Sequence, residues 1–341
     1  MIGILTFHNT TNFGASLQAY SLCKAIRSMG HECELVNYIC PSIVRREREL
    51  GRSKKLLKNI AKYVFIRPLF LKKLENFDAF IRDYTGKKIY TQENIHEAAD
   101  DYDALITGSD MIWNLGISGR DWTYFLDFKG RCRKYSYAAS SAEVWSNDDA
   151  ARIKDLLSDY DMLSSRDEDT CRYIRSEFGL ECEYVPDPTM LLETHEFPYA
   201  PPPQEQNYVF IYMQDKAILS AAYEYARRNN LIVIISGVKL PLKRNIRTIL
   251  SVNEWLSYIR GADAVFTNSY HGMLFSLYFG KPVWTNKKDS RLRSLLRLLD
   301  IESCFIDRDE GLTHRINYEI TQERLAQFRE KGINFLKRII N

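Results

Sequence analysis

Ser269, Tyr270, His271 and Gly272 stand where a short apolar run ending at Phe266 gives way to a helical pattern. The first turn of a helix carries N–H groups without intrahelical partners and the positive end of the helix dipole, so it attracts anions. Ser269 adds a hydroxyl and His271 a titratable ring. This segment could hold a phosphate or a carboxylate. An N-capping Ser269 and a merely solvated His271 would explain the same pattern.

Other chemically capable side chains follow apolar runs of strand length. They are His8 and Asn12 after the run 2–7, Ser109 and Asp110 after the run 104–107, and Arg166 after the run 162–164. Ligands of parallel sheets collect at the carboxyl ends of the strands, so loops from both halves of the chain are expected to line one cleft.

Each of these side chains also has a structural interpretation. Arg166 suits an anion because a guanidinium makes charge-assisted hydrogen bonds, but it could instead be a surface residue paired with Asp167 or Glu168. Ser109 and Asp110 could form a turn ahead of Trp113, which we assign to packing. The segment 187–189 reads as a turn with a structural role.

Apolar runs of strand length alternate with helical periodicity along the chain, which is typical of parallel α/β sheets. The predicted strands are 2–7, 34–38, 104–107, 135–139, 162–164, 208–213, 231–236, 264–267 and 283–285. Four prolines in 195–206 interrupt this alternation and predict a linker. We therefore expect an N-terminal Rossmann-like domain over 1–194, a C-terminal one over 207–320, and a C-terminal helix within 321–341 that packs back across the junction.

Four segments in order resemble the polysaccharide pyruvyl transferase family. They are the opening 3–20, the segment 107–114 (TGSDMIWN), the pair 164–167 and 187–192, and the segment 269–272. The chain departs from the family pattern at Met111, where Gln is more usual, and at Asn268, where an acidic residue often sits. The resemblance implies two Rossmann-like domains facing across a cleft, as in the glycosyltransferase B architecture.

The resemblance also implies a reaction: the enolpyruvyl unit of phosphoenolpyruvate moves onto two hydroxyls of a sugar, giving a cyclic pyruvate ketal and phosphate. Such a reaction needs donors for two anionic groups, an acid for the methylene carbon and a base for the hydroxyl. We expect His271 to act as acid or base or to contact the phosphate. The expected donor contacts are Arg166, Ser269, Tyr270 and Gly272, and the expected acceptor contacts are His8, Asn12, Ser109 and Asp110.

Composition agrees with a large soluble enzyme, and the reaction that the resemblance implies requires no metal or redox cofactor. The net charge of +3 over 341 residues does not call for a nucleic-acid partner, and no zinc, Walker or dinucleotide signature is present. The scattered, odd number of cysteines and the absence of a long apolar segment favour a cytoplasmic location. The basic, apolar-interleaved stretch 45–75, which we place in the N-terminal domain, fits either an ordinary helix pair or peripheral contact with the inner face of a membrane carrying a lipid-linked acceptor.

Two other functions fit the same pattern. A nucleotide-sugar glycosyltransferase would use this architecture with a base and ribose pocket in the C-terminal domain. A non-catalytic scaffold in polysaccharide biosynthesis should have eroded motifs, whereas Arg166 and His271 are both present.

Overall fold

The chain forms two compact units. The computed structural model describes residues 1–48, 64, 66–141, 145–237, 246–247, 249–286, 290–306, 312 and 316–341. The first unit comprises Met1–Glu49, Asp78–Leu192 and Ala326–Asn341, and the second comprises Leu50–Phe77 and Glu193–Leu325. The basic stretch 45–75 lies largely outside the described residues, and its described part from Arg67 onward groups with the second unit, not with the first.

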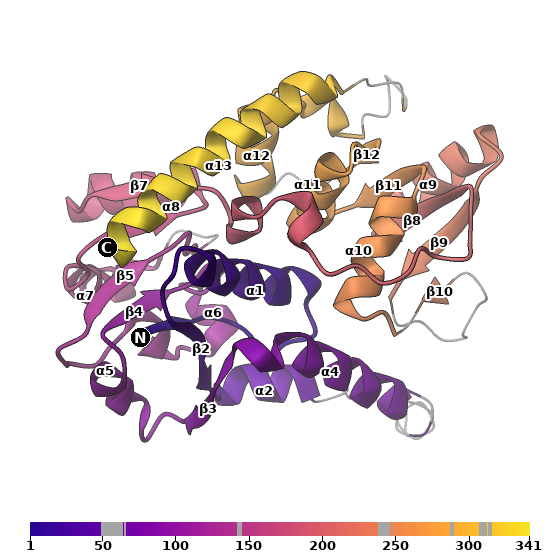
Figure 1. Cartoon of the computed structure of the whole chain (residues 1–341). Coiled ribbons are helices and arrows are strands. Elements are labelled where there is room, and N and C mark those ends of the chain that lie inside the picture. The colour runs from indigo at the N-terminus through magenta and orange to yellow at the C-terminus, as the bar shows by residue number, and fades with distance from the viewer. Residues whose placement is uncertain are drawn as a thin grey trace. The chain divides into compact units, whose positions relative to one another are not determined.

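The first unit is built on a parallel sheet in the order β3-β2-β1-β4-β5 (Figure 1). Its strands are β1 (Ile2–Leu5), β2 (Cys33–Tyr38), β3 (Thr85–Tyr90), β4 (Ala104–Thr107) and β5 (Arg133–Ser136). A parallel pair, β6 (Leu163–Ser165) and β7 (Cys182–Tyr184), follows β5 through a bridge between Tyr135 and Met162. The chain leaves β1 toward β2 on one side and returns to β4 on the other, so a topological switch point lies between β1 and β4.

Helices connect these strands. They are α1 (Phe13–Ser28), α2 (Pro41–Arg48), α5 (Ala98–Asp101), α6 (Leu115–Ser118), α7 (Asn147–Leu157) and α8 (Glu168–Tyr173), with the end of α4 (Arg67–Ile81) and the later part of α13 (Tyr318–Ile340). Helix α1 follows the first strand, as the expected alternation of strands and helical segments requires. It starts at Phe13 because the Asn12 side chain accepts hydrogen bonds from two first-turn N–H groups.

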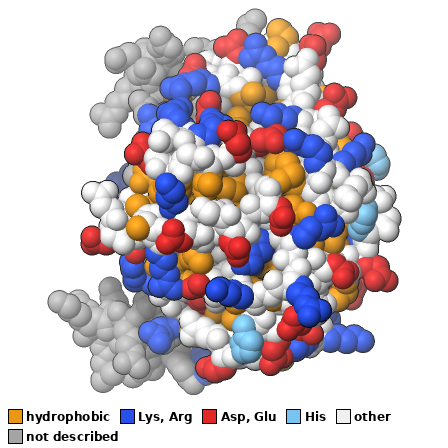
Figure 2. Space-filling view, turned by 90° about the vertical axis from the view of Figure 1, so that its left-hand side faces the viewer, with side chains coloured by type: hydrophobic (Ala, Val, Ile, Leu, Met, Phe, Trp, Pro, Cys, Tyr) orange, Lys and Arg blue, Asp and Glu red, His pale blue; other side chains and the backbone are white. Residues whose placement is uncertain are grey.

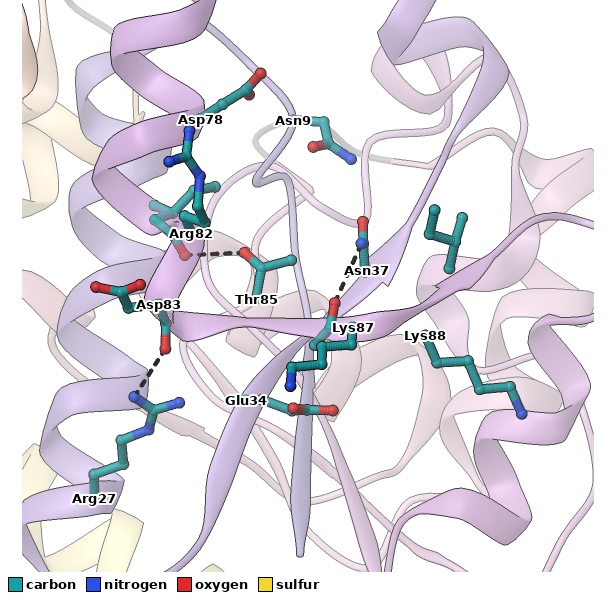
Figure 3. Close-up of a pocket in the computed structure, with 13 residues that line it drawn as sticks. Asn9, Arg27, Glu34, Asn37, Asp78, Arg82, Asp83, Thr85, Lys87 and Lys88 are labelled. Atoms are coloured by element: carbon teal, nitrogen blue, oxygen red, sulfur yellow. Dashed lines mark hydrogen bonds between the residues drawn. The ribbon is translucent and has the colours of Figure 1, made fainter.

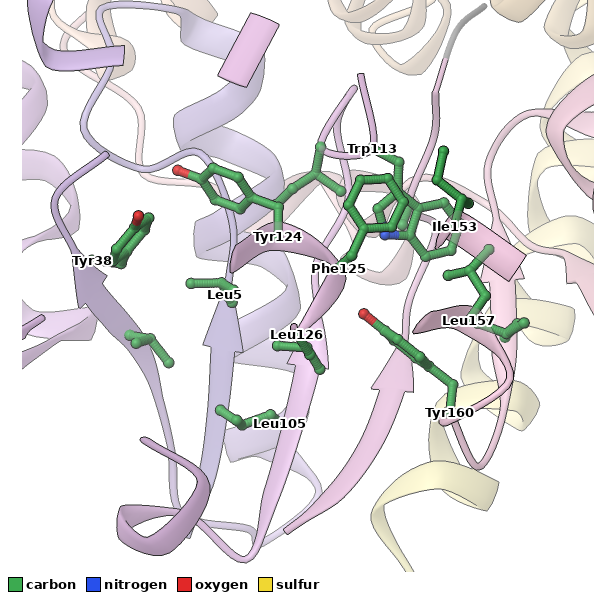
Figure 4. Close-up of a cluster of buried hydrophobic side chains, with 14 of the residues drawn as sticks. Leu5, Tyr38, Leu105, Trp113, Tyr124, Phe125, Leu126, Ile153, Leu157 and Tyr160 are labelled. Atoms are coloured by element: carbon green, nitrogen blue, oxygen red, sulfur yellow. The ribbon is translucent and has the colours of Figure 1, made fainter. Parts of the chain in front are cut away.

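The core of the first unit centres on aromatic side chains between the sheet and its helices (Figure 4). Trp113 is fully buried and stacks on Phe125 with ring centroids 6.0 Å apart, and the Tyr160 ring lies nearly perpendicular to it with centroids 6.4 Å apart. The predicted packing role of Trp113 is confirmed. Such a core fixes the loop after β4, because Trp113 follows that loop directly.

The later part of α13 packs on the first unit. The Phe328 ring lies 5.0 Å from that of Tyr184, and the Phe335 ring lies 6.0 Å from that of Tyr137. Arg329 donates a hydrogen bond of 2.8 Å to the Met190 carbonyl. These contacts hold the C-terminal residues against β7 and the turn after it.

The second unit repeats the same topology with a sheet in the order β10-β9-β8-β11-β12. Its strands are β8 (Tyr208–Tyr212), β9 (Ile232–Ser236), β10 (Ile246–Arg247), β11 (Ala264–Thr267) and β12 (Val283–Trp284). Its helices are α9 (Lys216–Arg228), α10 (Val252–Gly261), α11 (Tyr270–Tyr278) and α12 (Ser290–Leu299). Here the switch point lies between β8 and β11.

The predicted strands differ from the observed ones in two ways. The strands β3, β7 and β10 are absent from the prediction; β3 lies at the edge of its sheet and carries Gly86, Lys87 and Lys88, so it lacks an apolar run. The strand predicted over 135–139 ends at Ser136, because Ala138 takes a positive φ of 57° and turns the chain out of the sheet.

On the face drawn in Figure 2, basic and acidic side chains are intermingled and no large area carries a single sign. Among the described helices, none combines the length and the apolar character that crossing a membrane requires. All seven cysteines are buried free thiols, and the sulfurs of Cys171 and Cys182 lie 3.3 Å apart.

Candidate functional site

Several predicted site residues of the first unit gather at its switch point. His8 follows β1, and Ser109 and Asp110 follow β4, which is the neighbouring strand in the sheet. The Thr6 hydroxyl donates a 3.0 Å hydrogen bond to the Ser109 carbonyl and accepts one of 2.8 Å from the Gln18 amide. These bonds tie the loops after β1 and β4 to α1, so the position of Ser109 is fixed by the sheet and not by a free loop.

Arg166 reaches the same place from the end of β6. Arg166 is only 2% exposed, and its guanidinium donates to Asp187 Oδ2, to Asp110 Oδ1 at 2.9 Å and to Ser109 Oγ at 3.3 Å. The alternative in which Arg166 is a surface residue is therefore wrong. The guanidinium joins the loops that follow β4, β6 and β7. Its role in binding a donor anion stays a prediction.

Asp187 is the residue that sequence reasoning left out of this group. It is fully buried, and it accepts hydrogen bonds from Ser109 Oγ at 3.2 Å and from Thr189, through N at 3.0 Å and Oγ1 at 2.7 Å. The turn predicted at 187–189 is confirmed, and the same carboxylate compensates the charge of Arg166. Asp187 comes three residues after β7, a strand absent from the prediction, so the strand pattern did not mark it.

His8 is held as a neutral imidazole. The ring is 3% exposed, and burial lowers its pKa below the usual 6.5, against smaller opposing effects of the Thr6 carbonyl and the Asn37 side chain. Nδ1 lies 3.2 Å from the Thr6 carbonyl oxygen, an acceptor, so Nδ1 carries the proton. Nε2 then presents a lone pair, and it has no hydrogen-bond partner among the described residues.

Asn12, the other residue of this loop that we assigned to the acceptor, caps α1. Its side-chain oxygen accepts from Gly14 N at 2.9 Å and from Ala15 N at 3.4 Å. The first turn of α1 is thus already partly satisfied by the protein. The contact between Asn12 and an acceptor stays a prediction.

An open polar pocket of about 860 Å³ lies beside β2 and β3 in the same unit (Figure 3). Asn9, the residue after His8, lines one end of it, and none of the predicted acceptor residues does. Asn37 donates to the Gly86 carbonyl at 3.2 Å, and Arg27 donates to the Asp83 carbonyl at 3.3 Å. Because these polar groups already serve to hold β3, we assign no reacting group to this pocket.

In the second unit, the predicted helix start after β11 is confirmed. Helix α11 begins at Tyr270, and Ser269 caps it by accepting a hydrogen bond of 3.2 Å from Gly272 N. The capping interpretation of Ser269 is therefore correct, and its hydroxyl proton remains a donor. The solvated interpretation of His271 is wrong, because this residue is 7% exposed and its ring meets Tyr270 edge-on at 5.2 Å.

Gly272 is required for this helix start to approach β11. A Cβ at position 272 would lie 2.6 Å from Thr267 Oγ1, which itself accepts a hydrogen bond of 3.1 Å from Ser269 N. The close approach keeps the end of β11, the cap and the first helical turn together.

Replacing Gly272 with alanine is expected to lower the free energy of unfolding by about 1–3 kcal/mol, the usual cost of overpacking. The added methyl would push Thr267 away from Ser269 and disturb the first turn, so turnover should fall as well. Denaturant unfolding measures the first effect. Gly116→Ala is the control, since a Cβ there meets only the Asn114 side chain, at 3.2 Å. Equal stability of the two variants would contradict the packing argument.

Asp215, which lies between β8 and α9, is a second residue that sequence reasoning missed. It caps α9 by accepting from Ile218 N at 2.9 Å, and it also accepts from Asn286 Nδ2 at 2.8 Å and from Asn268 Nδ2 at 3.3 Å. The pKa of its carboxyl is lowered, first by the Ile218 N–H and then by these two amides. The polar residue after the first strand beyond the linker was the signal for it.

Within the described part of the chain, no group of three His, Cys, Asp or Glu side chains is arranged to hold a metal ion.

Comparison with solved structures shows the fold. The chain matches a structure assigned as a UDP-N-acetylglucosamine 2-epimerase from Listeria monocytogenes with a TM-score of 0.56 at 11% identity, covering 98% of this chain and 90% of that one. It matches the S. aureus MnaA–UDP complex with a TM-score of 0.54 at 10% identity, covering 100% and 94%. The expected pair of Rossmann-like domains of the glycosyltransferase B type is thereby confirmed.

No curated protein matches the chain. The polysaccharide pyruvyl transferase family, however, matches residues 12–285 of the chain. These residues include the α1 start, the Arg166 cluster and the α11 start described above. With a match over most of its length, this chain belongs to the polysaccharide pyruvyl transferase family.

Proposed function

We propose that this protein transfers the enolpyruvyl unit of phosphoenolpyruvate to two hydroxyls of a sugar in a cell-surface polysaccharide precursor. Two new bonds form between C2 and the sugar oxygens, and the bond between C2 and the phosphate oxygen breaks. Of the two hydroxyl protons, one ends on the methylene carbon, which becomes the ketal methyl, and the other leaves with phosphate. The family membership over residues 12–285 carries this proposal.

The α11 start is our proposed contact for the donor in the second unit. Helix N–H groups and the positive end of the dipole favour an anion, and the Ser269 hydroxyl can add a donated hydrogen bond. His271 stands in the first turn, where a neutral or protonated ring could contact the phosphate or deliver a proton to the methylene carbon. Tyr270 and Gly272 complete this contact, and we also propose Arg166 as a donor contact.

His8 is our proposed base for the acceptor hydroxyl. A base needs a lone pair at the working pH, and the Thr6 carbonyl leaves that lone pair on Nε2. Because burial lowers the pKa of His8, the ring stays neutral at pH values below the usual pKa of histidine. Asn12, Ser109 and Asp110 are the proposed acceptor contacts beside it.

The decisive experiment incubates the protein with phosphoenolpyruvate and a panel of free and lipid-linked oligosaccharides, with mass detection of products. A pyruvate ketal with release of one phosphate per product would support the proposal. The lipid-linked members test a site of action at the cytoplasmic face of the membrane. A parallel incubation replaces phosphoenolpyruvate with nucleotide sugars. Transfer of a sugar in that incubation would establish the glycosyltransferase alternative, which is favoured by the UDP bound in a solved structure of similar fold.

A thermal-shift panel of phosphoenolpyruvate, phosphate, UDP and nucleotide sugars separates the same alternatives without turnover. Stabilisation by phosphoenolpyruvate alone is expected, since a ligand that binds the folded state raises the melting temperature. Binding of no member of the panel would favour the non-catalytic scaffold.

Replacing His8 with glutamine is expected to slow turnover by about 10²–10⁴-fold, the usual contribution of a general base. In the wild type, kcat/KM should fall only at pH values below 6.5, the ordinary pKa of histidine. The reason is that burial lowers the pKa of His8, so the ring stays neutral at pH values where a free histidine is protonated. The glutamine variant should lose this acid limb.

The matched control is His96→Gln, at an exposed histidine of the same unit. A pH profile of His8→Gln that keeps the wild-type acid limb would remove His8 as the base.

A further inference from the structure

Three polar side chains meet at the carboxyl ends of β8, β11 and β12. Asp215 Oδ2 accepts from Asn286 Nδ2 at 2.8 Å and from Asn268 Nδ2 at 3.3 Å. Asn268 immediately precedes Ser269, the cap of α11, and Asp215 caps α9. This group, which we call the Asp215 network, therefore joins the starts of two helices at the switch point of the second sheet.

The Asn268 amide is held in one orientation. Its Oδ1 accepts from Thr285 Oγ1 at 3.1 Å and from Asn286 N at 3.2 Å, while its Nδ2 faces Asp215. The backbone N–H of Asn268 donates to the Met213 carbonyl at 3.2 Å, and Met213 itself has a positive φ of 52°. Both ends of the side chain and the backbone are thus engaged, so position 268 is fixed relative to three strands.

The charge of Asp215 is held by hydrogen bonds rather than by a cation. Its carboxylate accepts from the Ile218 N–H and from the two amides, and it forms no salt bridge with the described residues. A carboxylate near an anion-binding helix start would oppose a negatively charged ligand. The amide at position 268 donates a hydrogen bond to the Asp215 carboxylate. Because an amide is uncharged, it adds no second negative charge beside the cap of α11.

We propose that Asp215 and Asn286 are positioning residues that hold Asn268, and through it the α11 start, in the geometry that binds the phosphoenolpyruvate anion. This inference rests on the proposed function. It assigns no bond-making step to the network. It pairs the amide at position 268 with the acid at position 215.

The pairing predicts a particular pattern of loss and rescue. Asn268→Asp would place two carboxylates within hydrogen-bond distance, remove the donated hydrogen bond and add charge beside the cap. Asp215→Asn added to Asn268→Asp would restore one amide–carboxylate pair with the polarity reversed. In that double variant the carboxylate at position 268 could still accept from Thr285 and from the backbone N–H of Asn286. The amide at position 215 could still cap α9, because the asparagine side chain is as good an N-cap as that of aspartate.

The experiment measures phosphoenolpyruvate affinity by calorimetry, together with KM, kcat and the melting temperature, for Asn268→Asp, Asp215→Asn and the double variant. Asn268→Asp is expected to weaken phosphoenolpyruvate binding and raise its KM about tenfold or more, which is 1.4 kcal/mol, with kcat changed much less. The double variant should recover most of the affinity. Asn317→Asp, an exposed helix cap elsewhere in the second unit, controls for the added charge.

Three outcomes overturn the inference. If Asn268→Asp binds phosphoenolpyruvate like the wild type, the network does not position the donor site. If the double variant recovers the melting temperature but not the affinity, the network is only structural. If the wild type binds no phosphoenolpyruvate, the proposed function fails first and the inference fails with it, a result that the wild-type titration alone identifies.

Discussion

Replacing Arg166 with alanine is expected to lower the free energy of unfolding by about 3–5 kcal/mol, the range for breaking a buried ion pair. The guanidinium lies between the carboxylates of Asp110 and Asp187, and removing it leaves two negative charges in a buried place. Denaturant unfolding measures the loss. This is the largest stability effect that we expect for one side chain of the candidate site.

The control for Arg166 is Arg172→Ala, an exposed arginine paired with Asp169 one helical turn away. Exposed pairs contribute about 0–1 kcal/mol, so this variant should be nearly as stable as the wild type. A compensated variant, Arg166→Met with Asp110→Asn and Asp187→Asn, removes all three charges and should recover part of the lost stability. If the compensated variant is no more stable than Arg166→Ala, uncompensated charge is not the cause.

The same variants separate structure from donor binding. Arg166→Lys keeps the charge but cannot reach both carboxylates in the geometry of a guanidinium fork. If Arg166 also contacts the donor, Arg166→Ala should bind phosphoenolpyruvate more weakly by about 1.5–3 kcal/mol, the range for a hydrogen bond to a charged group, under conditions where the variant is fully folded. Arg166→Lys should recover only part of this loss. Unchanged affinity in a folded Arg166→Ala would leave Arg166 a purely structural role.

The parts of the site that could be predicted from sequence are local ones. The start of α11 follows from a strand-length run, a capping serine and a helical pattern, all within ten residues. The placement of His8 and Ser109 near each other follows from a general rule of parallel sheets, because β1 and β4 are neighbours around the switch point.

The parts that could not be predicted depend on partners distant in sequence. Asp110 and Asp187 approach Arg166 from loops 56 and 21 residues away, and no periodic pattern encodes which acid pairs with which base. Asp215 meets Asn286 across 71 residues for the same reason. The edge strand β3 escapes prediction because Gly86, Lys87 and Lys88 leave it without an apolar run, and only pairing with β2 makes it a strand.

Replacing His271 with glutamine is expected to slow turnover by about 10²–10⁴-fold if the ring transfers a proton, while phosphoenolpyruvate affinity falls much less. Glutamine can hydrogen-bond from a similar place on the first turn of α11, but it does not titrate. Glutamine is a sharper test than alanine, because the buried ring packs against Tyr270 and its removal would also leave a cavity.

The measurements for His271 are kcat, KM and the donor dissociation constant, with His195→Gln, at an exposed histidine, as the matched control in the same unit. If His271 only binds phosphate, glutamine should keep most of the rate. A His271→Gln variant that turns over like the wild type would therefore show that the proton for the methylene carbon comes from another group. His8 would then be the next candidate for that role, and a product ketal formed at normal rate in His8→Gln would exclude it in turn.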